Sequence, residues 1–314
     1  MEIEKKKLKK LLENEVEKCI NNGCEGILLS GGLDTSILAY IASKKTKNIK
    51  AFTLKFLQSS DEIYARKLCE ILKIKHYVLD ISYDALIENL RKTIEILKVF
   101  EPIEIRNSVA IYSVLNFAKN YVNSVMTGDG ADELFFGYDF LIKMGKNERK
   151  IYAEKMWGKM RFSSLELGEF LEIKIFTPYL SDAVKNYAIN LEEDKKINGN
   201  IGKWILRKSF EGLVPDEFIW REKVAIEYGS GTTKLKEIFE EKIGDEEFIR
   251  QKEKIKKEDG VIIRDKEHLY YYQIYKEIFG VVPKAKENEL SCKGCGAKIE
   301  YKNQFCRICG TSNE

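Results

Sequence analysis

The chain has 314 residues, of which 44% are hydrophobic, so it is long enough to bury one large core or two modest ones. Its 53 basic and 50 acidic residues leave a net charge of +3, so charge alone does not identify a nucleic-acid-binding protein. There is no run of about twenty apolar residues and the N-terminus is charged, so we expect a cytoplasmic protein without a membrane segment or signal peptide.

Helices and strands are predicted to alternate along the first part of the chain. Apolar residues at helical spacing predict a first helix over residues 4–21. The predicted strands are Gly26–Leu29, Ile49–Lys55, Lys75–Asp80 and Ser124–Thr127, and the later helices are Leu33–Ser43, Ser60–Leu72 and Ser108–Asn120. This alternation predicts an α/β fold with a doubly wound parallel sheet, which binds its ligands at the carboxyl ends of the strands.

Charged helical segments dominate from about residue 140 onward. We therefore expect an α/β core over residues 1–140 and a helical C-terminal subdomain over residues 141–282. Pro283 and the polar residues that follow predict a linker over residues 283–290, ahead of a cysteine module over residues 291–314.

The segment Ser30–Ser36 (SGGLDTS) joins a predicted strand to a predicted helix. Its glycines let main-chain N–H groups approach an anion, and the positive end of the helix dipole faces the same point. Asp34 suits an anion site only if a divalent cation lies between them, so the segment predicts a nucleotide bound with Mg²⁺. An ordinary glycine turn before a helix requires neither the two serine hydroxyls nor this carboxylate, so their presence favours a nucleotide site over such a turn.

Four of the seven cysteines form two CxxC pairs, which are Cys292 with Cys295 and Cys306 with Cys309. Four thiolates at this spacing predict a tetrahedral Zn²⁺ site. The module is too short to fold by apolar burial, so we expect the metal to stabilise a structural zinc ribbon that docks to a partner protein or RNA. The other three cysteines are scattered, which fits a reducing compartment without disulfides.

The segment Ser30–Ser36 resembles the motif of the N-type ATP pyrophosphatases, which cleave ATP between its α- and β-phosphates. Three later segments are similar to segments of the asparagine synthetase family and occur in the family's order: Thr127–Tyr138 (TGDGADELFFGY), Leu171–Asp182 (LEIKIFTPYLSD) and Val214–Lys223 (VPDEFIWREK). The resemblance implies an adenine nucleotide alpha-hydrolase-like fold and a ligase that forms AMP and pyrophosphate. Such an enzyme adenylates a carboxylate, with aspartate as the leading substrate, before a nitrogen nucleophile displaces AMP.

This resemblance also implies roles for individual residues. Lys223 matches the family's catalytic lysine, and Asp132 is expected to shape substrate binding. The expected Mg²⁺ ligands are Asp34 and Glu101, which aligns through Ile105-Arg106. The expected nucleotide-binding residues are Leu29, Ser30, Gly31, Gly32, Asp34, Thr35, Ser36, Gly128 and Asp129.

The chain departs from the family pattern at two places. The family's catalytic glutamate aligns with Lys98, and the nearest glutamate, Glu95, lies one helical turn earlier. Either a small insertion brings Glu95 to the site, or the enzyme uses another acid–base group and another carboxylate. The chain also begins at Met1-Glu2 without the family's glutaminase domain, so nitrogen is expected from ammonia, a separate glutaminase subunit or another amine.

Two other functions fit parts of the sequence. One is an ATP pyrophosphatase that adenylates tRNA or another macromolecule for thiolation or modification, since such enzymes often carry zinc modules. The other is a regulatory protein that has lost turnover. Residues 171–182 and 214–223 favour the amide-forming ligase over the tRNA enzyme, and intact Asp34 and Lys223 argue against loss of turnover. Nucleic acid is therefore not the favoured partner.

Overall fold

The computed structural model describes residues 1–301 and 305–313. Contacts divide the chain into two compact units, which we call the first unit (Met1–Asp80 and Val114–Ala225) and the second unit (Ile81–Ser113 and Ile226–Glu314). Both the expected α/β core and the expected helical subdomain contribute residues to each unit. The domain boundaries predicted at residues 140, 282 and 290 remain predictions from the sequence.

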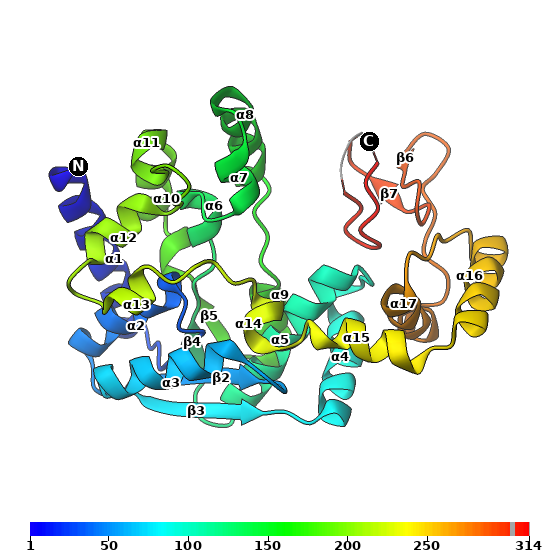
Figure 1. Ribbon diagram of the computed structural model, residues 1–314, viewed down its shortest axis with the longest axis horizontal. Helices are drawn as coiled ribbons and strands as arrows, with labels where there is room; N and C mark the ends of the chain where they lie inside the picture. Colours follow the sequence, from blue (N-terminus) through cyan, green and yellow to red (C-terminus); the bar gives the residue numbers. More distant parts are fainter. Residues whose placement is uncertain (302–304, 314) are drawn as a thin grey trace. The chain divides into compact units, whose positions relative to one another are not determined.

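The first unit is built on a sheet of five parallel strands in the order β3-β2-β1-β4-β5 (Figure 1). Its strands are β1 (Gly26–Leu28), β2 (Lys50–Lys55), β3 (Lys75–Asp80), β4 (Ser124–Met126) and β5 (Lys174–Phe176). In the central strand, Ile27 lies opposite Ala51 of β2 and Met126 of β4, and all three are fully buried. Both faces of such a sheet are covered at its centre, so the central strand is apolar. The predicted parallel sheet is confirmed.

Helix α1 buries one apolar side in the core of the first unit. In α1, Leu8, Leu12 and Val16 recur at helical spacing and are fully buried. Helix α1 packs on α2 and α12, and α3 packs on β2 and β3 (Figure 1). The helices are α1 (Glu2–Asn21), α2 (Leu33–Lys45), α3 (Ser60–Leu72), α6 (Ala131–Phe135), α7 (Asp139–Lys143), α8 (Lys146–Trp157), α9 (Ser163–Leu171), η1 (Pro178–Leu180), α10 (Asp182–Ile189), α11 (Glu193–Lys196), α12 (Trp204–Phe210) and α13 (Asp216–Ile219).

Strand β5 is not predicted by the sequence. It has three residues and lies at the edge of the sheet, where its side chains are half-buried or exposed, so it carries no apolar run. Its main chain nevertheless continues the sheet, because Lys174 N donates to Asn123 O at 2.9 Å and Thr127 N donates to Phe176 O at 3.0 Å. Pairing with β4, rather than local pattern, makes this segment a strand.

The second unit is mainly helical. Its elements are α4 (Tyr83–Leu97), α5 (Pro102–Ala118, whose last residues belong to the first unit), α14 (Ile226–Ser230), α15 (Lys234–Lys242), α16 (Asp245–Asp259), α17 (Lys266–Phe279), β6 (Leu290–Ser291) and β7 (Lys298–Ile299). Phe100 lies in its core, with its ring centroid 5.2 Å from His268 and 5.1 Å from Tyr272 of α17. In the part of the chain that the structure describes, no helix is long and apolar enough to cross a membrane.

Helix α5 begins six residues before its predicted start at Ser108. Proline is favoured in the first turn of a helix, where its missing N–H is not needed, and Pro102 occupies that position. The Glu101 carboxylate accepts a hydrogen bond from Glu104 N and so satisfies one free amide of that turn. These N-terminal signals extend the helix beyond its periodic apolar part.

Candidate active site

Two glycine-containing loops leave the sheet where its strand order changes direction. The chain runs from β1 outward to β2 and β3, and later places β4 on the opposite side of β1. The loop at residues 29–32 follows β1, and the loop at residues 127–130 follows β4. Open parallel sheets bind ligands at such switch points, outside the carboxyl ends of the strands. The predicted position of both motifs at strand ends is confirmed.

The loop after β1 is held in an open turn by its own hydroxyl groups. Thr35 Oγ1 lies 3.2 Å from Ser30 Oγ and accepts a hydrogen bond from Ser30 N at 3.3 Å. Gly31 has a φ of 66°, and a Cβ there would lie 2.5 Å from Tyr64 Cβ, so only glycine fits this position. Gly32 then caps α2, whose free amides and dipole favour an anion at this end.

The loop after β4 lies against the first loop. A Cβ on Gly128 would lie 3.2 Å from both Asp34 Cβ and Thr35 Cγ2, so the two motifs are in contact. Asp129 is directed elsewhere, because its Oδ2 accepts hydrogen bonds from Thr127 Oγ1 and from Ser164 Oγ. Burial raises the pKa of Asp129, and these two hydrogen bonds oppose that rise. In this structure Asp129 therefore orders the loop.

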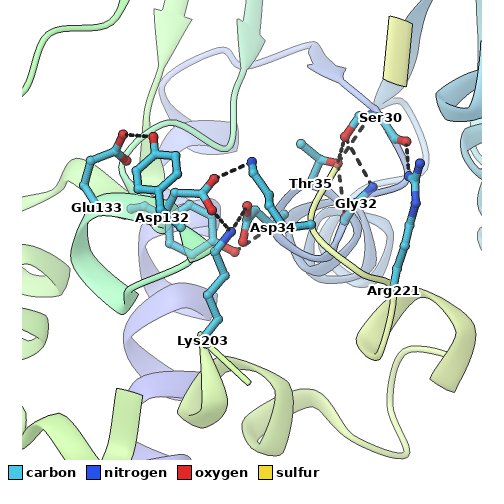
Figure 2. Close-up of polar contacts among 12 residues, drawn as sticks. Ser30, Gly32, Asp34, Thr35, Asp132, Glu133, Lys203 and Arg221 are labelled. Carbon is cyan, nitrogen blue, oxygen red and sulfur yellow. Dashed lines mark hydrogen bonds and ion pairs between the residues drawn. The ribbon is translucent and has the colours of Figure 1, made fainter. Parts of the chain in front are cut away.

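A lysine that the sequence does not single out joins the two motifs. Lys203 Nζ lies 2.6 Å from Asp34 Oδ2 and 2.7 Å from Asp132 Oδ1, and its side chain is only 4% exposed (Figure 2). Lys223 Nζ lies 2.7 Å from the other oxygen of Asp132, with one third of its side chain exposed. We call these two carboxylates and two ammonium groups the charge cluster. Its formal charges balance, as buried ions require.

The two lysines keep Asp132 ionised. Burial would raise the pKa of Asp132, but Lys203 and Lys223 outweigh burial and hold it below its ordinary range. Burial also tends to lower the pKa of Lys223, yet Asp132 and Asp34 raise it above its usual value. Lys223 thus stays a cation in a partly exposed position, where it can reach an anionic ligand.

Two buried polar atoms near the first loop are still able to contact a ligand. Among the described residues, Asp34 Oδ1 and Ser36 Oγ are buried without a hydrogen-bond partner. Such atoms are costly unless a ligand or water satisfies them, and Mg²⁺ prefers carboxylate oxygens. Asp34 therefore fits its predicted role as a magnesium ligand, and Ser36 fits its role at the phosphates, although both roles remain predictions. The main chain of Leu29 continues the pairing of β1 with β2, because Leu29 N donates to Phe52 O at 2.9 Å, and its carbonyl accepts from Thr53 Oγ1 at 2.6 Å.

Side chains from two of the family-like segments donate hydrogen bonds to main-chain carbonyls of the segment Ser30–Ser36. In Leu171–Asp182, Tyr179 is fully buried and donates from its hydroxyl to Asp34 O at 3.1 Å. In Val214–Lys223, Arg221 donates to Ser30 O at 2.8 Å (Figure 2). It also donates to Asp61 Oδ1 at 2.9 Å. The guanidinium also lies 4.0 Å from the centroid of the Tyr64 ring. Tyr179 therefore fixes the main chain of the first turn of α2, and Arg221 fixes that of the first loop.

Two predicted site residues belong to the second unit. Glu95 pairs with Lys92 at 2.8 Å on the exposed side of α4. Glu101 caps α5 and lies 3.6 Å from Arg264. Lys98, at the family position of the catalytic glutamate, ends α4 with a φ of 57°. Their roles in catalysis remain predictions.

The four module cysteines come together as a metal site requires. Their sulfur atoms all lie within 4.8 Å of one another, and all four residues are buried. The Sγ atoms of Cys292 and Cys309 are 3.7 Å apart, as are those of Cys295 and Cys306. Zinc–sulfur bonds of about 2.3 Å in a tetrahedron place sulfurs about 3.8 Å apart, so Zn²⁺ fits the site.

Lys203 is the functional candidate that sequence reasoning missed. It lies 169 residues from Asp34 in the chain and belongs to none of the four family-like segments. Two features of the chain are related to this lysine, but they can be interpreted only once the structure is known. Lys203 itself has a φ of 55°, and a Cβ on Gly137 would lie 2.2 Å from Lys203 Cε, so Gly137 makes room for the lysine.

The chain is similar to known proteins over most of its length. A family model described as asparagine synthase matches residues 7–169 and 171–287. The chain is 28% identical over 302 residues to an asparagine synthetase (glutamine-hydrolyzing) of Gallus gallus, and 27% identical over 301 residues to that of Homo sapiens. Each alignment covers 88% of this chain and 53% of the relative, so the chain spans about half the length of the curated relatives it matches.

One solved structure, NMN synthetase from Francisella tularensis, is similar over 73% of this chain and 91% of its own. Its identity of 22% and TM-score of 0.34 are too low to support an argument about function. The family match covers all four motif segments and both loops of the site. The chain therefore belongs to the asparagine synthase family.

Proposed function

We propose that this protein uses ATP to adenylate a carboxylate and then forms an amide from it, with AMP and pyrophosphate as the other products. The observation that carries the proposal is the charge cluster, which joins the two glycine-containing loops at the switch point of the sheet. Aspartate is the leading substrate. Nitrogen comes from ammonia or from a separate subunit that releases it.

In the first step, a carboxylate oxygen attacks the α-phosphorus of ATP and pyrophosphate leaves with the bonding electrons. Negative charge then grows on the phosphate oxygens. The free amides at the start of α2 and the ammonium group of Lys223 are the donors available for it. Mg²⁺, held by Asp34, would supply further positive charge at the pyrophosphate.

In the second step, the amine attacks the carbonyl carbon of the acyl adenylate, and AMP leaves as the tetrahedral intermediate collapses. Lys223 is the only cation of the charge cluster with a substantially exposed side chain, so it is the one placed to follow the charge that develops on the carbonyl oxygen. Fixed donors that meet charge only in the transition state act in this way. Lys203, being almost fully buried, keeps Asp34 and Asp132 in place instead.

ATP–pyrophosphate exchange tests the proposal directly. The full chain is incubated with labelled pyrophosphate, ATP, Mg²⁺ and a panel of carboxylates, with and without ammonium. We expect exchange that depends on aspartate, and asparagine formation when ammonium is added. Exchange that appears only with tRNA would instead identify an enzyme that adenylates a nucleic acid.

Asp34→Asn separates the metal-binding role from folding. Asparagine preserves the shape but binds Mg²⁺ poorly, so we expect pyrophosphate exchange to fall about 100-fold or more with unchanged circular dichroism. Asp194→Asn is a matched control, because Asp194 is 67% exposed and pairs with the neighbouring Lys195. Undiminished exchange in Asp34→Asn would remove Asp34 from the magnesium site.

A further inference from the structure

We propose that the metal-bound cysteine module is a positioning device for the connection between α4 and α5, and that it fixes Glu101 at the start of α5. The module was expected to be an appendage on a linker. Its contacts within the second unit show instead that three segments of that unit are hydrogen-bonded to the two CxxC turns.

One carbonyl within each CxxC turn accepts a main-chain hydrogen bond from the second unit. Ile308 O, between Cys306 and Cys309, accepts from Phe100 N at 2.8 Å. Gly294 O, between Cys292 and Cys295, accepts from Ile262 N at 2.7 Å. The cysteines on either side of each carbonyl belong to the common sulfur cluster. Metal closure of the turns therefore sets the direction of both acceptors.

The glycine after each CxxC turn makes a second contact of the same kind. Gly296 O accepts from Ala285 N at 2.8 Å, and Gly310 O accepts from Arg264 Nη1 at 3.0 Å. Both glycines have positive φ values, 73° for Gly296 and 74° for Gly310. Lys284 Nζ adds a bond to Cys295 O at 2.9 Å, so the start of the expected linker is attached to the module.

Glu101 is enclosed by these contacts. A Cβ on Gly310 would lie 2.3 Å from Glu101 Cγ, so the module packs directly on the glutamate side chain. Arg264, which donates to Gly310 O, lies 3.6 Å from Glu101 Oε1. The other carboxylate oxygen accepts from Glu104 N and caps α5. One carboxylate oxygen of Glu101 is thus positioned by α5, and the other lies toward Arg264 and the module.

The described part of the module contains little regular secondary structure. Its strands β6 and β7 have two residues each, and both residues of β6 are exposed. A segment of this size gains most of its folding free energy from its metal. Loss of the metal should therefore release Ile308 and Gly310, and with them Phe100 N and the Glu101 carboxylate.

The consequence for catalysis rests on the proposed function, in which Glu101 is an expected magnesium ligand. A structural metal bound more than 180 residues later in the chain would then govern how well the enzyme uses Mg²⁺. An independent docking module would have no such effect, since its metal would leave the α4–α5 connection unchanged.

Hydrogen–deuterium exchange of the full chain tests the positioning role without relying on activity. Bound metal is measured by elemental analysis, removed with a chelator and then restored as Zn²⁺. On removal we expect amides in residues 99–105 to exchange about tenfold faster or more, and to recover with Zn²⁺, while residues 37–42 of α2 stay protected. Unchanged exchange at residues 99–105 after complete metal loss would overturn the proposal.

Gly310→Ala tests the contact with the four cysteines left intact. The added methyl group would collide with Glu101, whereas in the control Gly212→Ala it would meet nothing within 4 Å at a similar φ of 75°. We expect full metal content and faster exchange at residues 99–105 only in Gly310→Ala. Exchange equal to that of the control in metal-loaded protein would refute the contact.

A Mg²⁺ titration of ATP–pyrophosphate exchange then separates the two proposals. If Glu101 binds Mg²⁺, Gly310→Ala should need about tenfold more Mg²⁺ for half-maximal exchange. Faster amide exchange with an unaltered Mg²⁺ requirement would support the positioning role and remove Glu101 from the proposed magnesium site.

Discussion

Replacing Lys203 by methionine removes the cation that lies between two buried carboxylates. Methionine keeps much of the side-chain volume, so the change is mainly one of charge. Asp132 retains Lys223, whereas Asp34 loses its 2.6 Å ion pair and its Oδ1 already has no hydrogen-bond partner among the described residues. Removing one partner of a buried pair costs about 3–5 kcal/mol, so we expect the free energy of unfolding to fall by about 3 kcal/mol at neutral pH.

The loss should depend on pH in a defined direction. Burial raises the pKa of Asp34 even though Lys203 opposes it, so the pKa should rise further in Lys203→Met. The folded variant then binds a proton that the unfolded chain releases, and its stability falls as pH rises toward that pKa. The deficit relative to the unchanged protein should therefore be smaller at about pH 5.5 than at about pH 7.5.

Urea unfolding at these two pH values measures both effects. In a double-mutant cycle with Asp34→Asn, the two changes together should cost less than their sum, because asparagine leaves no charge to be compensated. Lys67→Met is the control, since the Lys67–Glu217 pair is 56% and 38% exposed and should contribute less than about 1 kcal/mol. Full stability of Lys203→Met at neutral pH, or additive effects in the cycle, would refute the charge-cluster argument.

Two further predictions concern the surroundings of the cluster. Gly137→Ala would place a methyl group 2.0 Å from Asp132 Oδ1, so ATP–pyrophosphate exchange should fall about 100-fold, whereas Gly145→Ala, with nothing within 4 Å, should keep its activity. Equal activities would show that Gly137 makes no room for the cluster. Burial raises the pKa of Asp61 to about 6 against the pull of Arg221, so its ionisation lowers stability as pH rises from about 4 to about 6. Asp61→Asn should flatten this part of the curve of stability against pH, and parallel curves for the two proteins would contradict the reasoning.

Local signals in the sequence were sufficient to predict the elements that depend on neighbouring residues. The segment Ser30–Ser36 follows a short apolar run and opens a helix, and these features alone located it at the carboxyl end of a strand. Helix α3 has its predicted bounds, with Ser59 as its N-cap. Two CxxC pairs likewise predicted a cluster of four thiols, because a metal knuckle is defined by spacing within a few residues.

Long-range packing decided the remainder. Strand β5 exists because β4 offers it a partner, and Lys203 reaches Asp34 only because the fold brings residues 169 positions apart into contact. Glu101 was expected as a metal ligand, yet the contacts that fix it come from Gly310 and Arg264, which no local pattern connects to it. The sequence by itself thus determined the family, the phosphate loop and the cysteine quartet, since each is written in short-range spacing. Only the tertiary structure determined which charges share a buried site, because burial and distance are properties of the folded chain.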